Sequence, residues 1–172
     1  AGEPRLTYFE AVTILGFAVF ADEPVDVAVI EVGLGGITDA TNVGDGTVSV
    51  VTPISLDHTE LLGDNVADIA VEKAGIIKEH GFLISAAQPM EAAQVLLEKA
   101  REVGIPYRFE GVEFGVESRV MAVGGQMLTI AGLAGRYEDL LLPLHGKHQA
   151  ENAAVAVAAG VLACDAITIL LG

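Results

Sequence analysis

The chain has 172 residues, with 9 Lys and Arg against 24 Asp and Glu, which gives a formal charge of −15. This acidity argues against a nucleic-acid partner, because few cationic side chains are present to neutralise phosphates. Hydrophobic residues make up 52% of the chain, yet the longest apolar runs, Ala11–Ala21 and Ala153–Cys164, are shorter than the roughly 20 residues of a bilayer span. The single cysteine, Cys164, cannot form an internal disulfide, which favours a reducing compartment. We therefore expect a cytoplasmic α/β protein, monomeric and without a nucleic-acid or membrane partner.

The first half of the chain alternates helix and strand patterns. Thr7 and Glu10 have the spacing of a capping box, which predicts a helix running to Phe20. The β-branched run Val25–Ile30 then predicts a buried strand that ends at Glu31. The next predicted elements are a strand at 47–53, a helix at Val66–Lys78, a strand at Phe82–Ala86 and a helix at Met90–Val103 that Gly104 can end. This alternation predicts a mostly parallel sheet flanked by helices.

The pattern changes after about residue 107. Short β-type stretches separated by glycine-rich turns predict a small antiparallel meander, at Val112–Glu117, Arg119–Ala122, Met127–Ile130 and Asp139–Leu142. A final helix is expected to begin near His148. Its middle, Ala153–Cys164, is apolar on every side, so we expect it to be buried.

Polar residues follow two of the predicted parallel strands. Ligands of open parallel sheets bind beyond the carboxyl ends of the strands, and Glu31 ends the first strand while Asp57 and His58 follow the second. If these strands are neighbours, Glu31 and His58 converge on one edge. From the spacing alone, Glu31 could equally well cap a solvated strand end. A lone histidine such as His58 is more often an ordinary loop residue than a ligand.

Lys73 lies on the apolar face of a predicted helix, with Val66, Ile69 and Ile76. A lysine on such a face must extend to solvent, pair with a carboxylate or lose its charge. A desolvated neutral amine is a nucleophile and can react with carbon dioxide to give a carbamate. The alternative is a charged Lys73 paired with Asp68 or another neighbouring carboxylate.

Two common nucleotide-binding fingerprints fail in this chain. Gly33-x-Gly35 begins a dinucleotide motif, but Thr38 stands where its last glycine is needed. The Gly146-Lys147 pair lacks the other residues of a phosphate-binding P-loop.

Six short motifs occur along the chain. Each is weak evidence by itself, but the six in this order indicate one protein family. They are Thr7–Glu10, Glu31–Gly36, Asp39–Asn42, Leu56–Thr59, Glu72–Lys78 and Gly146–Ala154. Over roughly residues 5–163, this set closely resembles the folylpolyglutamate synthase/dihydrofolate synthase family of the Mur ligase superfamily. The resemblance implies that residues 1–172 form a partial P-loop NTPase-like central ATPase domain.

The resemblance also implies a reaction. ATP phosphorylates the carboxylate of dihydropteroate or of a folate's terminal glutamate, and the amine of L-glutamate attacks the acyl phosphate. Glu31, His58 and Lys73 match the family's catalytic and magnesium-binding positions, with Lys73 carrying a carbamate; two Mg²⁺ ions are implied, and Mn²⁺ would tolerate the imidazole better. The ATP positions are His148 and Asn152, and the substrate positions are Thr7, Phe9, Glu10, Thr38, Asp39 and Ala40. From the residues alone, we would expect Phe9 to be a core residue and Glu10 to be only the capping partner of Thr7.

The chain also departs from the family pattern. Ile37 and Thr38 stand where the family usually carries an arginine and an apolar residue, and Asp165–Gly172 matches nothing in the family. From the resemblance, we expect residues 1–172 to be a fragment without the family's P-loop and C-terminal domain. We therefore expect the chain alone to be inactive in ligation. A peptidoglycan-type Mur ligase and a non-catalytic pterin-binding relative remain the alternatives.

Overall fold

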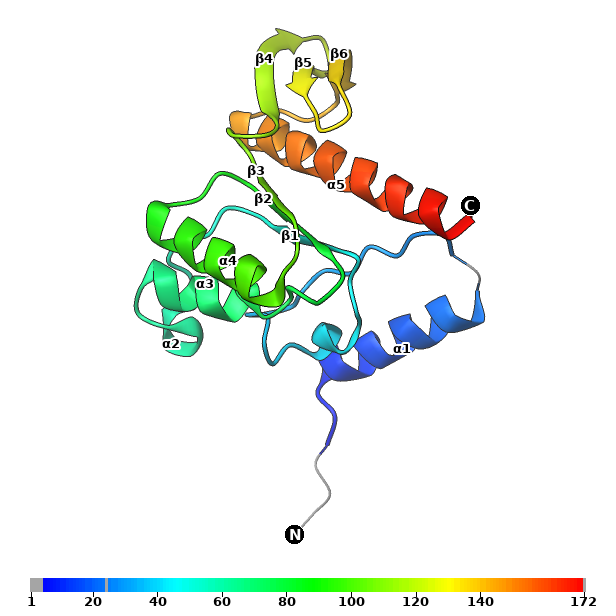
Figure 1. Ribbon diagram of the computed structural model, residues 1–172, viewed down its shortest axis with the longest axis vertical. Coiled ribbons are helices and arrows are strands. Elements are labelled where there is room, and N and C mark those ends of the chain that lie inside the picture. The colour runs from blue at the N-terminus through cyan, green and yellow to red at the C-terminus, as the bar shows by residue number, and fades with distance from the viewer. Residues whose placement is uncertain (1–4, 24, 172) are drawn as a thin grey trace.

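The computed structural model describes residues 5–23 and 25–171, which form helices and two three-stranded sheets (Figure 1). The first sheet is parallel, in the order β1 (Val48–Val51), β2 (Phe82–Ser85) and β3 (Tyr107–Phe109). The second is antiparallel, in the order β4 (Gly115–Ala122), β5 (Gly125–Ala131) and β6 (Arg136–Leu142). The predicted α/β class, a parallel sheet flanked by helices with an antiparallel meander, is confirmed.

Helices cover both faces of the parallel sheet. One face packs on α3 (Val66–Ala74) and α4 (Met90–Val103), and the other packs on α5 (Lys147–Leu171), which also lies against β4 (Figure 1). Consecutive strand residues point to opposite faces, so Leu83 enters the α3–α4 core while Ile84 enters the α5 core. None of the helices described is long and apolar enough to cross a membrane.

Two helices with clear local signals form where the sequence predicts them. The first helix, α1 (Tyr8–Asp22), starts with the predicted capping box, in which Thr7 and Glu10 each hydrogen-bond the backbone of the other. Helix α4 occupies Met90–Val103, and Gly104 ends it with a left-handed φ of 80°. Both outcomes follow from residues within one turn of the helix end: the side chains of Thr7 and Glu10 at the start of α1, and the left-handed backbone of Gly104 after α4.

The prediction of a buried strand at Val25–Ile30 is wrong. The segment belongs to no sheet, and Val27 and Val29 are 52% and 89% exposed. A strand needs a neighbour that supplies backbone hydrogen bonds, and β1 pairs only with β2 among the strands described. The helix α1 shares this exposure, because none of its residues is buried.

Helix α3 ends at Ala74, four residues before the predicted end at Lys78. The Ile37 N–H donates to the Glu72 carbonyl over 3.1 Å, and Asn42 Nδ2 donates to the Gly75 carbonyl over 3.2 Å. Ile76 and Ile77 instead bond three residues back, to Lys73 and Ala74. The last turn therefore tightens as the preceding loop packs against it.

The sequence does not predict the shortest elements of the fold. The strand β3, the short helix α2 (Thr59–Leu62) and the 3-10 helix η1 (Ala40–Val43) were not predicted. The first two predicted meander segments form the single strand β4, with an irregularity between Val116 and Ser118.

Helix α5 is buried on one side only, so the prediction for its middle is partly wrong. Ala150, Ala154, Val155 and Ala158 are buried, while Ala156 and Gly160 are exposed. Alanine and glycine expose little apolar surface. The apolar helix can therefore leave the face that carries Ala156 and Gly160 in contact with solvent. The helix extends through the unmatched tail to Leu171, and Gly172 lies outside the described residues.

Candidate functional site

A pocket of about 250 Å³ lies beyond the carboxyl end of β1, where ligands bind in parallel sheets. Three segments that are far apart in the sequence build it: a glycine loop, the chain that follows β1, and helices α2 and α3. The lining residues are Val32, Gly33, Leu34, Gly35, Pro53, Ser55, Asp57, His58, Leu62, Ile69 and Lys73. His58 and Lys73, which the sequence nominated separately, thus share one pocket.

His58 enters the pocket from a strained backbone position. Its φ is 48° and its ψ is 40°, in the left-handed region that non-glycine residues rarely adopt. The His58 carbonyl accepts hydrogen bonds from Leu61 and Leu62 at 2.9 Å, which start α2. Asp57 Oδ1 accepts from the His58 backbone N–H at 2.9 Å and lies 3.9 Å from His58 Nε2. Such strain is often held in place at functional sites.

Lys73 is half-buried at the pocket wall and does not pair with Asp68. The Asp68 carboxylate instead accepts a hydrogen bond from Asn65 Nδ2 at 2.7 Å, beside the N-cap of α3. No ion pair or side-chain hydrogen bond within residues 5–23 and 25–171 involves the Lys73 ammonium. Among the described residues, Lys73 therefore does not show the predicted pairing with a carboxylate.

Asp39 holds the glycine loop in shape. Its carboxylate accepts hydrogen bonds from the backbone N–H groups of Gly33, Leu34 and Thr41 at 2.9–3.1 Å, and from Thr41 Oγ1. Partial burial raises the pKa of Asp39, but these hydrogen bonds outweigh it and the pKa lies below its ordinary value. Thr38 beside it is exposed, and Ala40 begins η1.

Glu31 stands at the border of the pocket rather than in its wall. It is exposed and precedes Val32, the first lining residue. The expected convergence of two neighbouring strands does not occur, because Val25–Ile30 belongs to no sheet. Within the part of the chain described, no three His, Cys, Asp or Glu side chains are grouped closely enough to hold a metal ion.

Helix α1 contacts the glycine loop through Phe9. A Cβ at Gly33 would lie 2.5 Å from Phe9 Cζ, so the ring rests directly on this glycine. Thr7 and Glu10 are engaged with each other: Glu10 Oε2 accepts from Thr7 N at 2.7 Å and from Thr7 Oγ1 at 2.8 Å. These bonds lower the pKa of Glu10.

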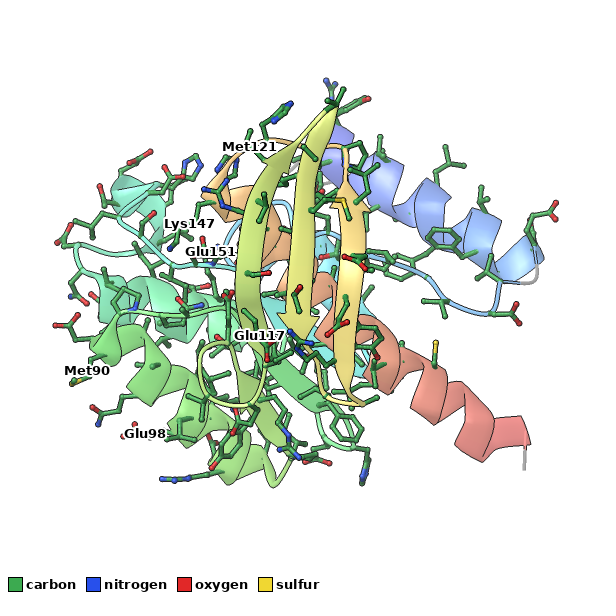
Figure 2. The ribbon with its side chains drawn as sticks, turned by 90° about the horizontal axis from the view of Figure 1, so that it is seen from above. Met90, Glu98, Glu117, Met121, Lys147 and Glu151 are labelled. Atoms are coloured by element: carbon green, nitrogen blue, oxygen red, sulfur yellow. The ribbon has the colours of Figure 1, made fainter. Side chains whose placement is uncertain are left out.

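The predicted ATP positions lie at the start of α5 and do not line this pocket. His148 and Asn152 are both exposed. Lys147, which directly precedes His148, donates from its Nζ to Glu151 Oε1 at 2.6 Å, near the antiparallel sheet (Figure 2), and this bond raises the pKa of Lys147.

Two polar pocket residues, Ser55 and Asp57, fall outside the predicted site set. The sequence could have indicated them, because both follow closely after the strand predicted at 47–53, on the side where ligands of parallel sheets bind.

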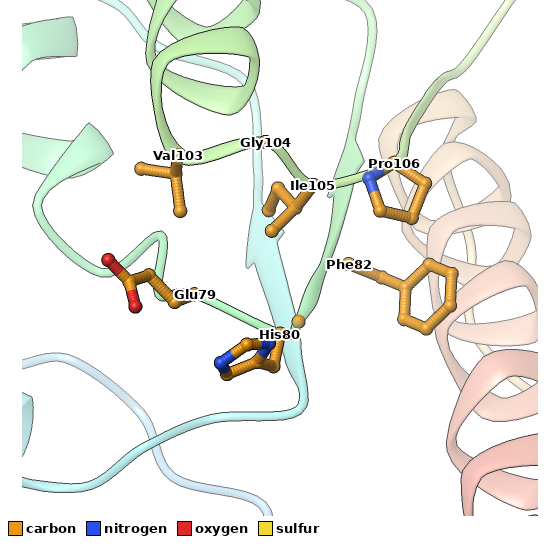
Figure 3. A pocket seen from close by; sticks show the side chains of 8 residues that line it. Glu79, His80, Phe82, Val103, Gly104, Ile105 and Pro106 are labelled. Carbon is orange, nitrogen blue, oxygen red and sulfur yellow. The ribbon is translucent and has the colours of Figure 1, made fainter.

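A second pocket of about 300 Å³ lies at the opposite, amino edge of the sheet, between the starts of β2 and β3 (Figure 3). It is lined by Glu79, His80, Gly81, Phe82, Val103, Gly104, Ile105 and Pro106.

Known proteins resemble this chain over nearly its whole length. A dihydrofolate synthase/folylpolyglutamate synthase from Mycobacterium tuberculosis is 47% identical over 163 residues, which cover 91% of this chain and 34% of that protein. The solved M. tuberculosis folylpolyglutamate synthase complexed with ADP superposes with a TM-score of 0.89 and 47% identity, over 92% of this chain and 36% of the other. An FPGS–AMPPCP–folate complex gives a TM-score of 0.92 at 37% identity, over 95% of this chain and 40% of the other.

This chain spans 34–36% of the length of three of the curated relatives it matches and 19–24% of five others. The model of the Mur ligase middle domain matches residues 2–160. The chain belongs to the Mur ligase middle-domain family.

Proposed function

We propose that the complete protein containing this chain is an ATP-dependent ligase that joins L-glutamate to the carboxylate of dihydropteroate, of folates, or of both. The observation that carries the proposal is the pocket in which His58 and Lys73 meet the glycine loop. The 47% identity to a dihydrofolate synthase/folylpolyglutamate synthase supports it. In this reaction ATP converts the carboxylate to an acyl phosphate, and the glutamate amine displaces phosphate to form an amide.

The residues around the pocket suit hard divalent cations. Carboxylate oxygens of Glu31 and carbamate oxygens on Lys73 are ligands that Mg²⁺ prefers, and the imidazole of His58 is better tolerated by Mn²⁺. Lys73 is half-buried, and no carboxylate of the described residues forms an ion pair with its amine. An amine in this environment is suited to carbamate formation. We infer that these three residues would hold two Mg²⁺ ions. Bound there, the metals would offset the negative charge that develops between phosphate and carboxylate.

The substrate positions extend the pocket toward α1. The Phe9 ring on Gly33 provides a flat apolar surface for a pterin, and we infer that Thr7, Glu10, Thr38, Asp39 and Ala40 surround it. Asp39 acts by holding the loop, because its carboxylate oxygens accept from Gly33, Leu34 and Thr41. His148 and Asn152 at the start of α5 are the proposed ATP contacts. We also infer a cytoplasmic monomer, in keeping with the single cysteine.

The test is a ligation assay with the complete protein, ATP, Mg²⁺ and L-glutamate. Dihydropteroate, reduced folate and a nucleotide-linked muramyl substrate are offered separately, and the products are identified by mass. We expect glutamylated pterin products and release of phosphate. Turnover of the muramyl substrate alone would assign the protein to peptidoglycan synthesis, and pterin binding without any turnover would identify a non-catalytic relative.

A further inference from the structure

We propose that Gln88 is a positioning residue that holds the pocket segment Ser55–His58 in place. Among the described residues, its side chain hydrogen-bonds Thr52, Ile54 and Ser85, none of which is a predicted site residue, and it does not line the pocket. The inference rests on the proposed function in one respect: it assumes that the placement of His58 matters for binding a metal ion.

The Gln88 side chain continues the pairing of β1 and β2 beyond the end of the sheet. The ladder stops where Val51 pairs with Ser85, after a last bond from Ala86 N to the Val51 carbonyl at 2.9 Å. Past that point, Gln88 Oε1 accepts from Ile54 N at 2.8 Å, and Gln88 Nε2 donates to the Thr52 carbonyl at 2.9 Å. One side chain thus supplies the donor and the acceptor that a neighbouring strand would supply.

Gln88 contacts a buried residue at each end of this bridge. Gln88 Nε2 also donates to Ser85 Oγ at 3.2 Å, and Ser85 is fully buried with its hydroxyl donating to the Ala86 carbonyl at 2.9 Å. On the other side, Ile54 is 3% exposed and packs in the same core cluster as Ile69. Thr52–Ile54 is therefore fixed by the side-chain bridge from Gln88, which follows β2, and by the burial of Ile54.

The pocket segment beyond Ile54 has little other support. No hydrogen bond within the described ranges involves the backbone of Ser55, Leu56 or Asp57. The segment is held at one end by the Gln88 bridge and at the other by His58, whose carbonyl starts α2. Since His58 is already at a φ of 48°, release of the first end allows its backbone to relax.

The bridge requires the amide of glutamine. Gln88→Met keeps the length of the side chain and removes all three hydrogen bonds. Gln88→Glu keeps an acceptor for Ile54 N but loses the donor to the Thr52 carbonyl, so it should restore part of the effect. Gln94→Met is a matched control, because Gln94 is exposed on α4 and bonds only Glu98, at 2.9 Å.

The experiment uses ¹⁵N-labelled chain and its three variants. We expect Gln88→Met to speed amide exchange at Ile54 roughly fivefold or more. We also expect the order parameters of Leu56–His58 to fall from rigid values to below about 0.6, with exchange at Leu83 and Leu96 unchanged. Gln88→Glu should lie between Gln88→Met and the unmodified chain, and Gln94→Met should match the unmodified chain.

A titration of the complete protein and its Gln88→Met variant with Mn²⁺, read by electron paramagnetic resonance, tests the link to His58. We expect Gln88→Met to weaken Mn²⁺ binding at least about fivefold, as loss of outer support for metal ligands typically does. Unchanged order at Leu56–His58, or unchanged Mn²⁺ affinity despite lost order, overturns the positioning role. If the unmodified complete protein binds no Mn²⁺, the metal site of the proposed function fails, and the order of Leu56–His58 alone decides the role of Gln88.

Discussion

The α-carbon of Gly36 packs directly against the backbone carbonyl of Glu72, on the helix that carries Lys73. A Cβ built on Gly36 would overlap this carbonyl and lie 3.1 Å from the Lys73 α-carbon. The same carbonyl accepts the Ile37 N–H at 3.1 Å. Gly75 completes the contact, because a Cβ there would meet the backbone nitrogen of Ile37 at 2.7 Å. This glycine contact brings the pocket loop and Lys73 together.

A methyl group at position 36 should therefore separate the loop from α3. We expect Gly36→Ala to destabilise the chain by about 2 kcal/mol, in the range of overpacked sites, in urea unfolding followed by circular dichroism. Gly16→Ala is the control, because no atom lies within 4 Å of a Cβ at that helical position. The control should be stabilised by roughly 0.5–1 kcal/mol. Equal effects of the two substitutions would show that the close approach contributes nothing to stability.

Lys73 should matter for the chemical step and little for folding. In the complete protein we expect Lys73→Ala to lower kcat by at least about 100-fold, the scale of losing a group that stabilises charge in the transition state. Its Tm should change by only a few degrees, because the ammonium makes no ion pair within the described residues. The control Lys99→Ala removes an amine that pairs with Glu102 at 3.2 Å on α4 and should leave kcat unchanged. A loss of stability that matches the loss of activity would contradict the catalytic role.

The parts of the fold that the sequence predicted depend on signals within a few residues. The capping box of α1 and the glycine that ends α4 are local, and both helices form as predicted. The run Val25–Ile30 carries an equally clear local pattern but has no partner strand among the described residues. Conversely, β3 has only three residues, and its pairing with β2 makes it a strand. Strand formation depends on neighbours, which a local pattern does not contain.

The same distinction applies to the pocket. His58 and Lys73 could be nominated from a strand end and a helix face, and both line the pocket. The Gln88 bridge spans 34 residues to Ile54 and 36 to Thr52, so no motif reveals it. The packing of Gly36 on Glu72 also joins distant segments. Contacts of this kind become visible only once the chain is folded.

Asp39 should make the glycine loop sensitive to acid. Its pKa lies below the ordinary value of 3.8 in the folded state, so the unfolded chain binds the proton first as the pH falls. The stabilisation is fully present above about pH 5 and is lost as the pH falls through 3.8 toward the folded pKa. We expect Asp39→Asn to cost less than about 1 kcal/mol at pH 7, because solvent screens this partly exposed carboxylate.

Urea unfolding at pH 7 and at pH 3.5 measures the effect of Asp39→Asn. The difference between Asp39→Asn and the unmodified chain should shrink at the lower pH. Asp45→Asn is the control, because Asp45 is exposed and takes no part in the hydrogen bonds of the described residues. A difference that grows on acidification would have the wrong sign for a lowered pKa.

Gln126 should support the start of α5 from within the antiparallel sheet. It is fully buried, its Nε2 donates to the Gly146 carbonyl at 3.1 Å, and its Oε1 accepts from Arg119 at 3.1 Å. Gln126→Met keeps the volume but leaves that carbonyl without its side-chain donor, which should cost about 1–3 kcal/mol in urea unfolding. Because Gly146 directly precedes α5, amide exchange in the first turn of that helix should accelerate more than in β2. The exposed Gln94→Met should change neither quantity, and exchange that rises equally in β2 and α5 would show a general loss of stability instead of a specific support for this helix.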